Sequence, residues 1–195
     1  NAGLSAYKNN FWALRSNSSS ANWAIVCNSG LVSGALAVGT ESETLCEDIL
    51  TRAMNSLRGN LKRFTTDQGA IHEGFTYLEY AQRYAVRGLA GMEWVLGSDF
   101  GLSATQALSE TASVPLYFGG PSGVTFSASD DAEGSLRRGW LWPWSARRFN
   151  QPFHNSWNNT NTNPIALDAL WQVDGGLTPA SAGASPDMAC KGEAN

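Results

Sequence analysis

The stretch DQGAIHEGFTYLEY, residues 67–80, holds the side chains of this sequence that are best suited to proton transfer. It places Asp67, His72, Glu73 and two tyrosines around a pair of glycines. A carboxylate or an imidazole can remove a proton from a substrate, and a phenol can deliver one. A surface loop needs none of these groups, so the stretch predicts a catalytic cleft.

Two long helices are predicted to position this stretch. Residues 40–64 begin with Thr40 and Glu43, which match the S/T-x-x-E capping box, and continue with an apolar residue at every fourth position. Helical spacing returns at Phe75 and ends near Gly97. The apolar stripes of the two helices are Leu45, Ile49, Ala53, Leu57 and Leu61, then Phe75, Leu78, Ala81, Ala85, Leu89 and Met92.

The residues before Pro115 predict further helices and no strands. NWAIVCNSGLVSGALAVG, residues 22–39, predicts a buried helix whose small residues let a neighbouring helix approach closely, namely Gly30, Ser33, Gly34, Ala35 and Ala37. Residues 3–15 and 102–114 predict two shorter helices. No alternation typical of strands occurs in the first 115 residues. The fold class is therefore predicted as all-α, built from antiparallel helical hairpins.

After Pro115 the composition changes. Residues 115–135 are rich in Gly, Pro, Ser and Asp, and residues 136–157 contain four tryptophans and four arginines. We expect an irregular Trp/Arg-rich segment that packs across the end of the helical array. Residues 158–195 are polar and then rich in Gly, Ala and Pro, which predicts a tail or linker. The predicted domains are accordingly 1–157 and 158–195.

Charge and hydropathy exclude two classes of protein. The net charge of −4 and the pI of about 5.1 argue against a general nucleic-acid binder, and no apolar run reaches the roughly 20 residues that span a bilayer. No Cys/His spacing indicates zinc, so neither a metal nor a cofactor is expected.

Three cysteines do not form a disulfide framework. Cys27 and Cys46 fall in successive predicted helices at unequal heights, and we interpret both as small buried apolar residues. N-x-S/T sequons at Asn17 and Asn158 fit a glycoprotein that is secreted or extracytoplasmic.

Two stretches taken together, NWAIVCNSGLVSGALA and DQGAIHEGFTYLEY, resemble the paired motifs of the heparinase II/III-like and alginate-lyase-like polysaccharide lyases. In that family an Asn-Trp or Asn-His pair opens one inner helix of an incomplete (α/α) toroid. A DG…EG..Y..Y motif opens another about 55 residues later, which is the separation between Asn22 and Tyr77. GPSGVTFSASDD resembles the family's segment just past the toroid, and SARRFNQP its trailing region.

The resemblance covers roughly residues 10–155 and implies the C-terminal part of such a toroid. A family toroid is longer than this chain and is often followed by a β-sandwich domain. We therefore expect other segments or chains to complete the toroid and to supply that domain.

The resemblance implies cleavage of a uronic-acid-containing polysaccharide by β-elimination. Asn22 would neutralise the uronate carboxylate, because a side-chain amide donates hydrogen bonds without titrating. Tyr77, in the first turn of its helix, would be the acid and could also be the base. His72 would be either the base or a cation that lowers the pKa of Tyr77. The alternative for Asn22 is a plain helix N-cap, and for Tyr77 a buried core tyrosine.

Four further residues are candidates for binding the acidic polysaccharide: Trp23, Glu73, Tyr80 and Arg83. Aromatic faces stack on sugar rings, and arginine pairs with carboxylates. Each has a structural alternative. Glu73 could cap the start of a helix or orient Asn22, and Tyr80 could belong to core packing.

Two other functions stay open from the residues alone. Asp67 and Glu73 could form the carboxylate pair of a glycoside hydrolase on a helical toroid. The chain could also be a non-catalytic carbohydrate-binding or structural fragment, since a partial toroid leaves apolar helix faces uncovered.

Overall fold

The computed structural model describes residues 2–15, 22–64, 73–111, 114, 124–131 and 141–151. These residues are mostly helical and contain no strand, which confirms the all-α prediction. The chain divides into two compact units, residues 1–137 and 138–195, and each is described here by itself.

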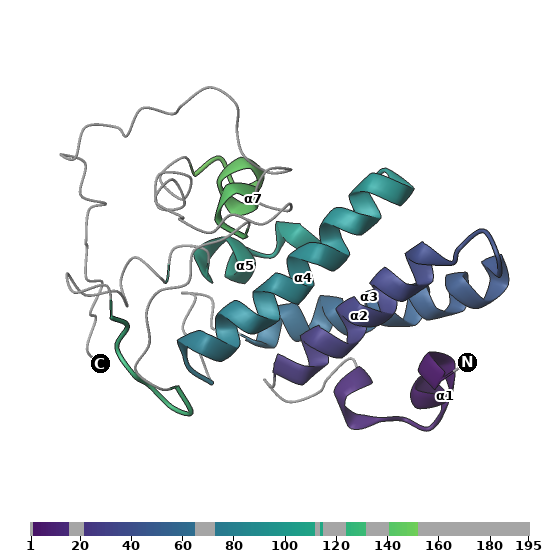
Figure 1. Cartoon of the computed structure of the whole chain (residues 1–195), viewed down its shortest axis with the longest axis horizontal. Coiled ribbons are helices and arrows are strands. Elements are labelled where there is room, and N and C mark those ends of the chain that lie inside the picture. Colours follow the sequence, from purple (N-terminus) through teal and green to yellow (C-terminus); the bar gives the residue numbers. More distant parts are fainter. Residues whose placement is uncertain are drawn as a thin grey trace. The chain divides into compact units, whose positions relative to one another are not determined.

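The first unit is organised around one central helix, α2 (Asn22–Ala37), which packs against both α3 (Glu43–Phe64) and α4 (Phe75–Leu96). A short turn joins α2 to α3, and the two helices run antiparallel (Figure 1). At the start of α2, Asn22 bonds to Glu73, two residues before α4 begins. Near the end of α2, Leu36 lies against Gly91 of α4. Helices α2 and α4 therefore run in the same direction.

Shorter elements cover this three-helix arrangement. Helix α1 (Ala2–Lys8) packs on α3, and the 3-10 helix η1 (Trp12–Leu14) packs on α2. After α4 the chain forms a second 3-10 turn, η2 (Leu102–Ala104), and the helix α5 (Gln106–Thr111), both of which contact α3.

The two predicted apolar stripes are confirmed as core. In α3 the four stripe residues Ile49, Ala53, Leu57 and Leu61 are buried, and Leu45 at the start of the stripe is half-buried. All six stripe residues of α4 are buried, from Phe75 to Met92. Burying a side chain of this size contributes roughly 1.5–3 kcal/mol, so a spacing of three to four residues decides which face turns inward. Gly97, in the left-handed conformation, ends α4 as predicted.

The predicted buried helix, α2, is buried along only part of its surface. Of the five small residues predicted to admit a neighbouring helix, Ala35 is buried and the other four, Gly30, Ser33, Gly34 and Ala37, are exposed. A Cβ atom at Gly30 or Gly34 would meet nothing within 4 Å. The close approach comes from the other helix instead, because Gly88 of α4 lies against Ser29, where a Cβ would be 3.4 Å from the serine Cβ.

Three predicted helix boundaries also need correction. Thr40 does not cap α3: it lies in a turn closed by a hydrogen bond from Glu41 N to Val38 O, and the helix starts at Glu43. The helix predicted over 3–15 is divided into α1 and η1, with Asn10 at a positive φ of 53° between them. The helix predicted over 102–114 is interrupted at Thr105, whose backbone is extended.

The second unit contains one described helix, α7 (Leu141–Arg148), within the Trp/Arg-rich segment. Trp144 is buried and meets Phe149 edge-to-face, with ring centroids 5.8 Å apart. Arg147 and Arg148 are exposed in the last turn, where positive charge suits the helix dipole. Part of this segment is therefore regular helix rather than irregular chain.

Candidate functional site

The start of α2 is tied to the chain just before α4 by one carboxylate. Glu73 Oε2 accepts a hydrogen bond from the backbone N of Asn22 at 2.6 Å and a second from Asn22 Nδ2 at 3.3 Å. The first N–H groups of a helix have no partner within it, and the helix dipole favours negative charge there. Glu73 therefore caps α2 from a position 51 residues away and orients the Asn22 amide, which is one of the structural roles predicted for it. The other predicted role, organising the start of the helix that follows it, is taken by a different carboxylate.

The start of α4 is capped by a second carboxylate, that of Asp131. Its Oδ2 accepts a hydrogen bond from the backbone N of Phe75 at 2.9 Å, and its Oδ1 accepts one from the hydroxyl of Thr76. Asp131 is buried and lies 56 residues from Phe75. Sequence reasoning missed this residue as a contributor to the site. The only signal for it was its place at the end of the segment GPSGVTFSASDD.

Gly74 makes the contact between Asp131 and α4 possible. Its φ of 90° and ψ of 170° are open essentially to glycine alone. A Cβ atom here would overlap the Ala128 carbonyl oxygen and would lie 2.7 Å from the Cβ of Asp131. The glycine predicted to permit a tight helix entry thus also allows a loop distant in sequence to close on the helix start.

Tyr77 lies in the first turn of α4 with 37% of its surface exposed, while Phe75 and Leu78 on either side are buried. It is therefore not the buried core tyrosine of the alternative interpretation. Glu73, four residues earlier, is bonded to Asn22. Because α2 and α4 run in the same direction, Asn22 and Tyr77 stand at neighbouring helix starts that Glu73 links.

Trp23 and Tyr80 are both exposed and both aromatic. Trp23, directly after the buried Asn22, has 56% of its surface exposed. Tyr80 lies one turn beyond Tyr77 and meets Tyr84 edge-to-face, with ring centroids 5.1 Å apart. The hydrogen bond between the two phenols raises the pKa of Tyr80, so Tyr80 stays protonated and suits a hydrogen-bonding rather than a base role.

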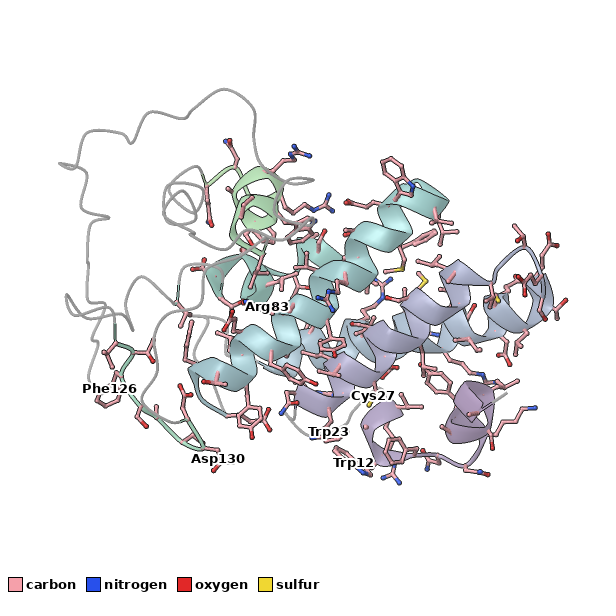
Figure 2. The ribbon with its side chains drawn as sticks, in the orientation of Figure 1. Trp12, Trp23, Cys27, Arg83, Phe126 and Asp130 are labelled. Carbon is pink, nitrogen blue, oxygen red and sulfur yellow. The ribbon has the colours of Figure 1, made fainter. Side chains whose placement is uncertain are left out.

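Arg83 is occupied by a neighbouring acid. Its Nη2 and Nε donate to Glu79 Oε1 at 2.6 and 3.0 Å. Glu79 is buried, and a buried carboxylate needs such a cation. Arg83 thus has a structural role on α4, although part of its side chain remains exposed, and Figure 2 labels its position on that helix.

Cys27 lies on the partly exposed side of α2 and is half-buried, which corrects its interpretation as a buried residue, whereas Cys46 is buried as expected. Both are free thiols. Burial raises the pKa of the Cys27 thiol, so it is less reactive than an ordinary cysteine. Cys190 lies outside the described residues.

Several predicted residues lie outside the described part of the chain: His72, Asp67, Asn17 and Asn158. Their roles stay predictions. In the ranges that the structure describes, no three His, Cys, Asp or Glu side chains gather as a metal site would require. None of the helices described is both long enough and apolar enough to cross a bilayer.

Comparison with known proteins leaves the site to be interpreted on its own geometry. No protein-family model matches the chain, and no curated protein matches it.

Proposed function

We propose that this chain is part of a polysaccharide lyase that cleaves a uronic-acid-containing polysaccharide by β-elimination, on a partial (α/α) toroid. The helix order supports the architecture. Helices α2 and α4 run in the same direction, as inner helices of a toroid do, and α3 returns antiparallel to α2 as an outer helix would. Helix α5 packs on α3, as the next outer helix would.

The observation that carries the proposal is the pair of hydrogen bonds from Asn22 to Glu73. They bring the two sequence motifs to one place, so that a buried amide and an exposed phenol lie at adjacent helix starts. An amide nitrogen has two N–H groups, and Glu73 accepts from Nδ2 at a single oxygen. In this proposal the second N–H binds the substrate carboxylate.

The reaction needs three functions at this place. The proton on C5 becomes acidic only when the neighbouring carboxylate is hydrogen-bonded or neutralised, which is the role of the Asn22 amide. A base removes that proton, and an acid protonates the O4 leaving oxygen as the C4–O bond breaks. Tyr77 is the proposed acid. The base is His72 or Tyr77 itself.

Glu73 is less suited to the glycoside hydrolase alternative. A hydrolase acid must protonate the glycosidic oxygen, whereas one oxygen of the Glu73 carboxylate already accepts two hydrogen bonds from Asn22 at the start of α2. The same bonds make Glu73 a residue that positions Asn22 rather than one that contacts the reacting atoms.

The test is the ultraviolet absorbance of the C4–C5 double bond, which β-elimination creates and hydrolysis does not. The 195-residue protein is incubated with alginate, a heparan-type polymer and polyglucuronate. We expect the absorbance to rise with at least one polymer. For Tyr77→Phe the rate of this rise should be at least about 100-fold lower, which is the loss typical of a removed general acid. Asn22→Ala, which keeps the backbone N–H that binds Glu73, should also lose most activity.

Trp94→Ala is the matched control, because Trp94 is an almost fully exposed aromatic residue at the other end of α4. It should react at the wild-type rate. Undiminished absorbance in Tyr77→Phe would remove the proposed acid, and no absorbance with any of the three polymers would end the lyase proposal.

A further inference from the structure

Two neighbouring aromatic residues, Phe11 and Trp12, are exposed next to a buried pair. Phe11 and Trp12 have 41% and 44% of their surface exposed, whereas Ala13 and Leu14 directly after them are buried. Their rings lie 5.7 Å apart at an interplanar angle of 51°. Arg15 follows and is exposed. We call Phe11, Trp12 and Arg15 the aromatic ledge.

Buried polar side chains of two helices hold the ledge in place. The carbonyl of Ala13 accepts a hydrogen bond from Asn28 Nδ2 of α2 at 3.2 Å. The carbonyl of Arg15 accepts hydrogen bonds from Ser56 Oγ at 3.1 Å and Asn60 Nδ2 at 2.9 Å, both of α3. These hydrogen bonds fix the backbone of the segment, so its aromatic side chains can bind with little further loss of backbone entropy.

The first 40 residues, which include the ledge, carry positive charge, although the chain as a whole is acidic. Residues 1–40 contain Lys8 and Arg15 but no Asp or Glu, in a chain of net charge −4. Both cations are exposed, and Arg15 Nε donates to Asn10 O at 3.2 Å, which holds its guanidinium beside the ledge. The surface therefore combines flat apolar rings with cations, which suits a ligand that is both a sugar and an acid.

The ledge lies close to the candidate site. The 3-10 helix η1 packs on α2, whose first turn carries the exposed Trp23. Figure 2 shows Trp12 and Trp23 at the same edge of the first unit, where η1 meets the start of α2. Glu73 is the acidic group at this end of α2, and its carboxylate is occupied by the N–H groups of Asn22.

We propose that the aromatic ledge, together with Trp23, binds sugar units of an acidic polysaccharide beyond the units that react at Asn22 and Tyr77. The aromatic rings stack on the apolar faces of the sugar rings, and Arg15 pairs with a uronate carboxylate. The position of this binding site relative to the reacting residues rests on the proposed function. The binding itself does not.

The experiment measures affinity apart from cleavage. Calorimetric titration of the Tyr77→Phe protein, which does not consume its ligand, uses an alginate hexasaccharide, with neutral cellohexaose as the matched ligand. We expect Trp12→Ala to weaken binding of the alginate hexasaccharide by at least about tenfold, the loss expected from one buried aromatic anchor. Trp12→Phe should restore most of it, and Trp94→Ala should have no effect.

Arg15→Gln tests the charged half of the proposal. It should weaken alginate binding by about threefold to tenfold and make the remaining affinity less dependent on salt, because one screened ion pair is lost. Cellohexaose should bind more weakly than alginate to the parent protein and should be insensitive to Arg15→Gln. Circular dichroism of each variant checks that the exposed substitutions leave the fold intact.

The outcomes separate the two proposals. If Trp12→Ala binds alginate as tightly as its parent, the ledge proposal is wrong even where uronate cleavage is observed. If binding depends on Trp12 but the wild-type protein yields no unsaturated product, the ledge stands and the lyase proposal fails. If Trp12→Ala changes only self-association in sedimentation velocity, the ledge is a contact between copies of this chain, which also overturns the proposal.

Discussion

The starts of α2 and α4 are capped in the same way but in different surroundings. Each receives a carboxylate from more than 50 residues away in sequence, Glu73 for α2 and Asp131 for α4. Asp131 is buried and held against Gly74, so water cannot replace it. Glu73 is half-buried, and it binds an amide as well as a backbone N–H.

Because the two capping carboxylates differ in burial and in the groups that they bind, the two helix starts have different roles. At α4 the cap fixes the backbone, because a buried N–H left without a partner is costly. At α2 the cap also binds the side-chain amide of Asn22, and the exposed Trp23 follows directly in the sequence. A rigid start of α4 then provides the reference against which Asn22 and Tyr77 are positioned.

The largest effect is expected from Gly74→Ala. A Cβ there meets a backbone oxygen, and the φ of 90° is itself strained for alanine, so we expect a loss of about 3 kcal/mol or more in the free energy of unfolding. Gly97→Ala is the control, because its φ of 76° is also positive but its Cβ meets nothing within 4 Å. That change should cost only about 1 kcal/mol. Equal losses in urea unfolding would show that crowding by Asp131 and Ala128 is unimportant.

Asp131→Ala should cause the second largest loss in the free energy of unfolding. It removes the acceptor of the Phe75 N–H in a buried place, which costs about 2 kcal/mol. The neighbouring Asp130 is exposed, and Asp130→Ala should lie within about 0.5 kcal/mol of the wild type. The urea midpoints of the two variants measure the difference. A shift of the same size in both would mean that loss of charge, rather than loss of the cap, is responsible.

Glu73→Gln should destabilise less, by about 0.5–1 kcal/mol, because the amide keeps one acceptor oxygen and water reaches this place. Thermal unfolding at low and high salt is the measurement, since a contribution from the helix dipole is screened by salt. Glu110→Gln, an exposed acid on α5, is the control. A loss as large as that of Asp131→Ala would contradict the contrast between the two helix starts.

The smallest expected effect is a pH dependence of the free energy of unfolding that arises from Cys27, on the partly exposed side of α2. Burial raises the pKa of Cys27, so the folded state favours the thiol. The protonated thiol therefore contributes to the free energy of unfolding. This contribution is complete below the pKa of an unfolded cysteine, about 8.5, and it is lost as the pH rises through the higher pKa of the folded state. Stability should therefore decline gently from pH 8 to 10, and the decline should be shallower in Cys27→Ala. Parallel slopes for the two proteins would rule this out.

Tyr7 should add to the alkaline decline above about pH 10, where an ordinary tyrosine ionises. Burial raises its pKa, and its hydroxyl donates to Asn28 Oδ1 at 2.6 Å. Stability should again fall as the pH rises, as for Cys27, because folding favours the protonated form of Tyr7. This second phase should persist in the Cys27→Ala protein.

The periodic helices were predictable because their pattern is local. The stripe from Phe75 to Met92 recurs every three or four residues, and so does most of the stripe in α3, which places each on one buried face. Helix α2 has no such stripe, and its small residues gave no indication of which side would be covered. Its partner uses Gly88 for the close approach, which is visible only when both helices are in place.

The sequence by itself determined that the described chain is helical, where two of its long helices bury their faces, and that Asn22, Glu73 and Tyr77 belong to helix starts. Only the tertiary structure decided that Glu73 binds Asn22, that Asp131 caps α4 and that Arg83 is held by the buried Glu79. The physical reason is the separation in sequence between the residues that interact. Helix periodicity arises from neighbours three and four residues apart, whereas a cap is chosen by whichever acceptor the packed chain brings to the free N–H groups.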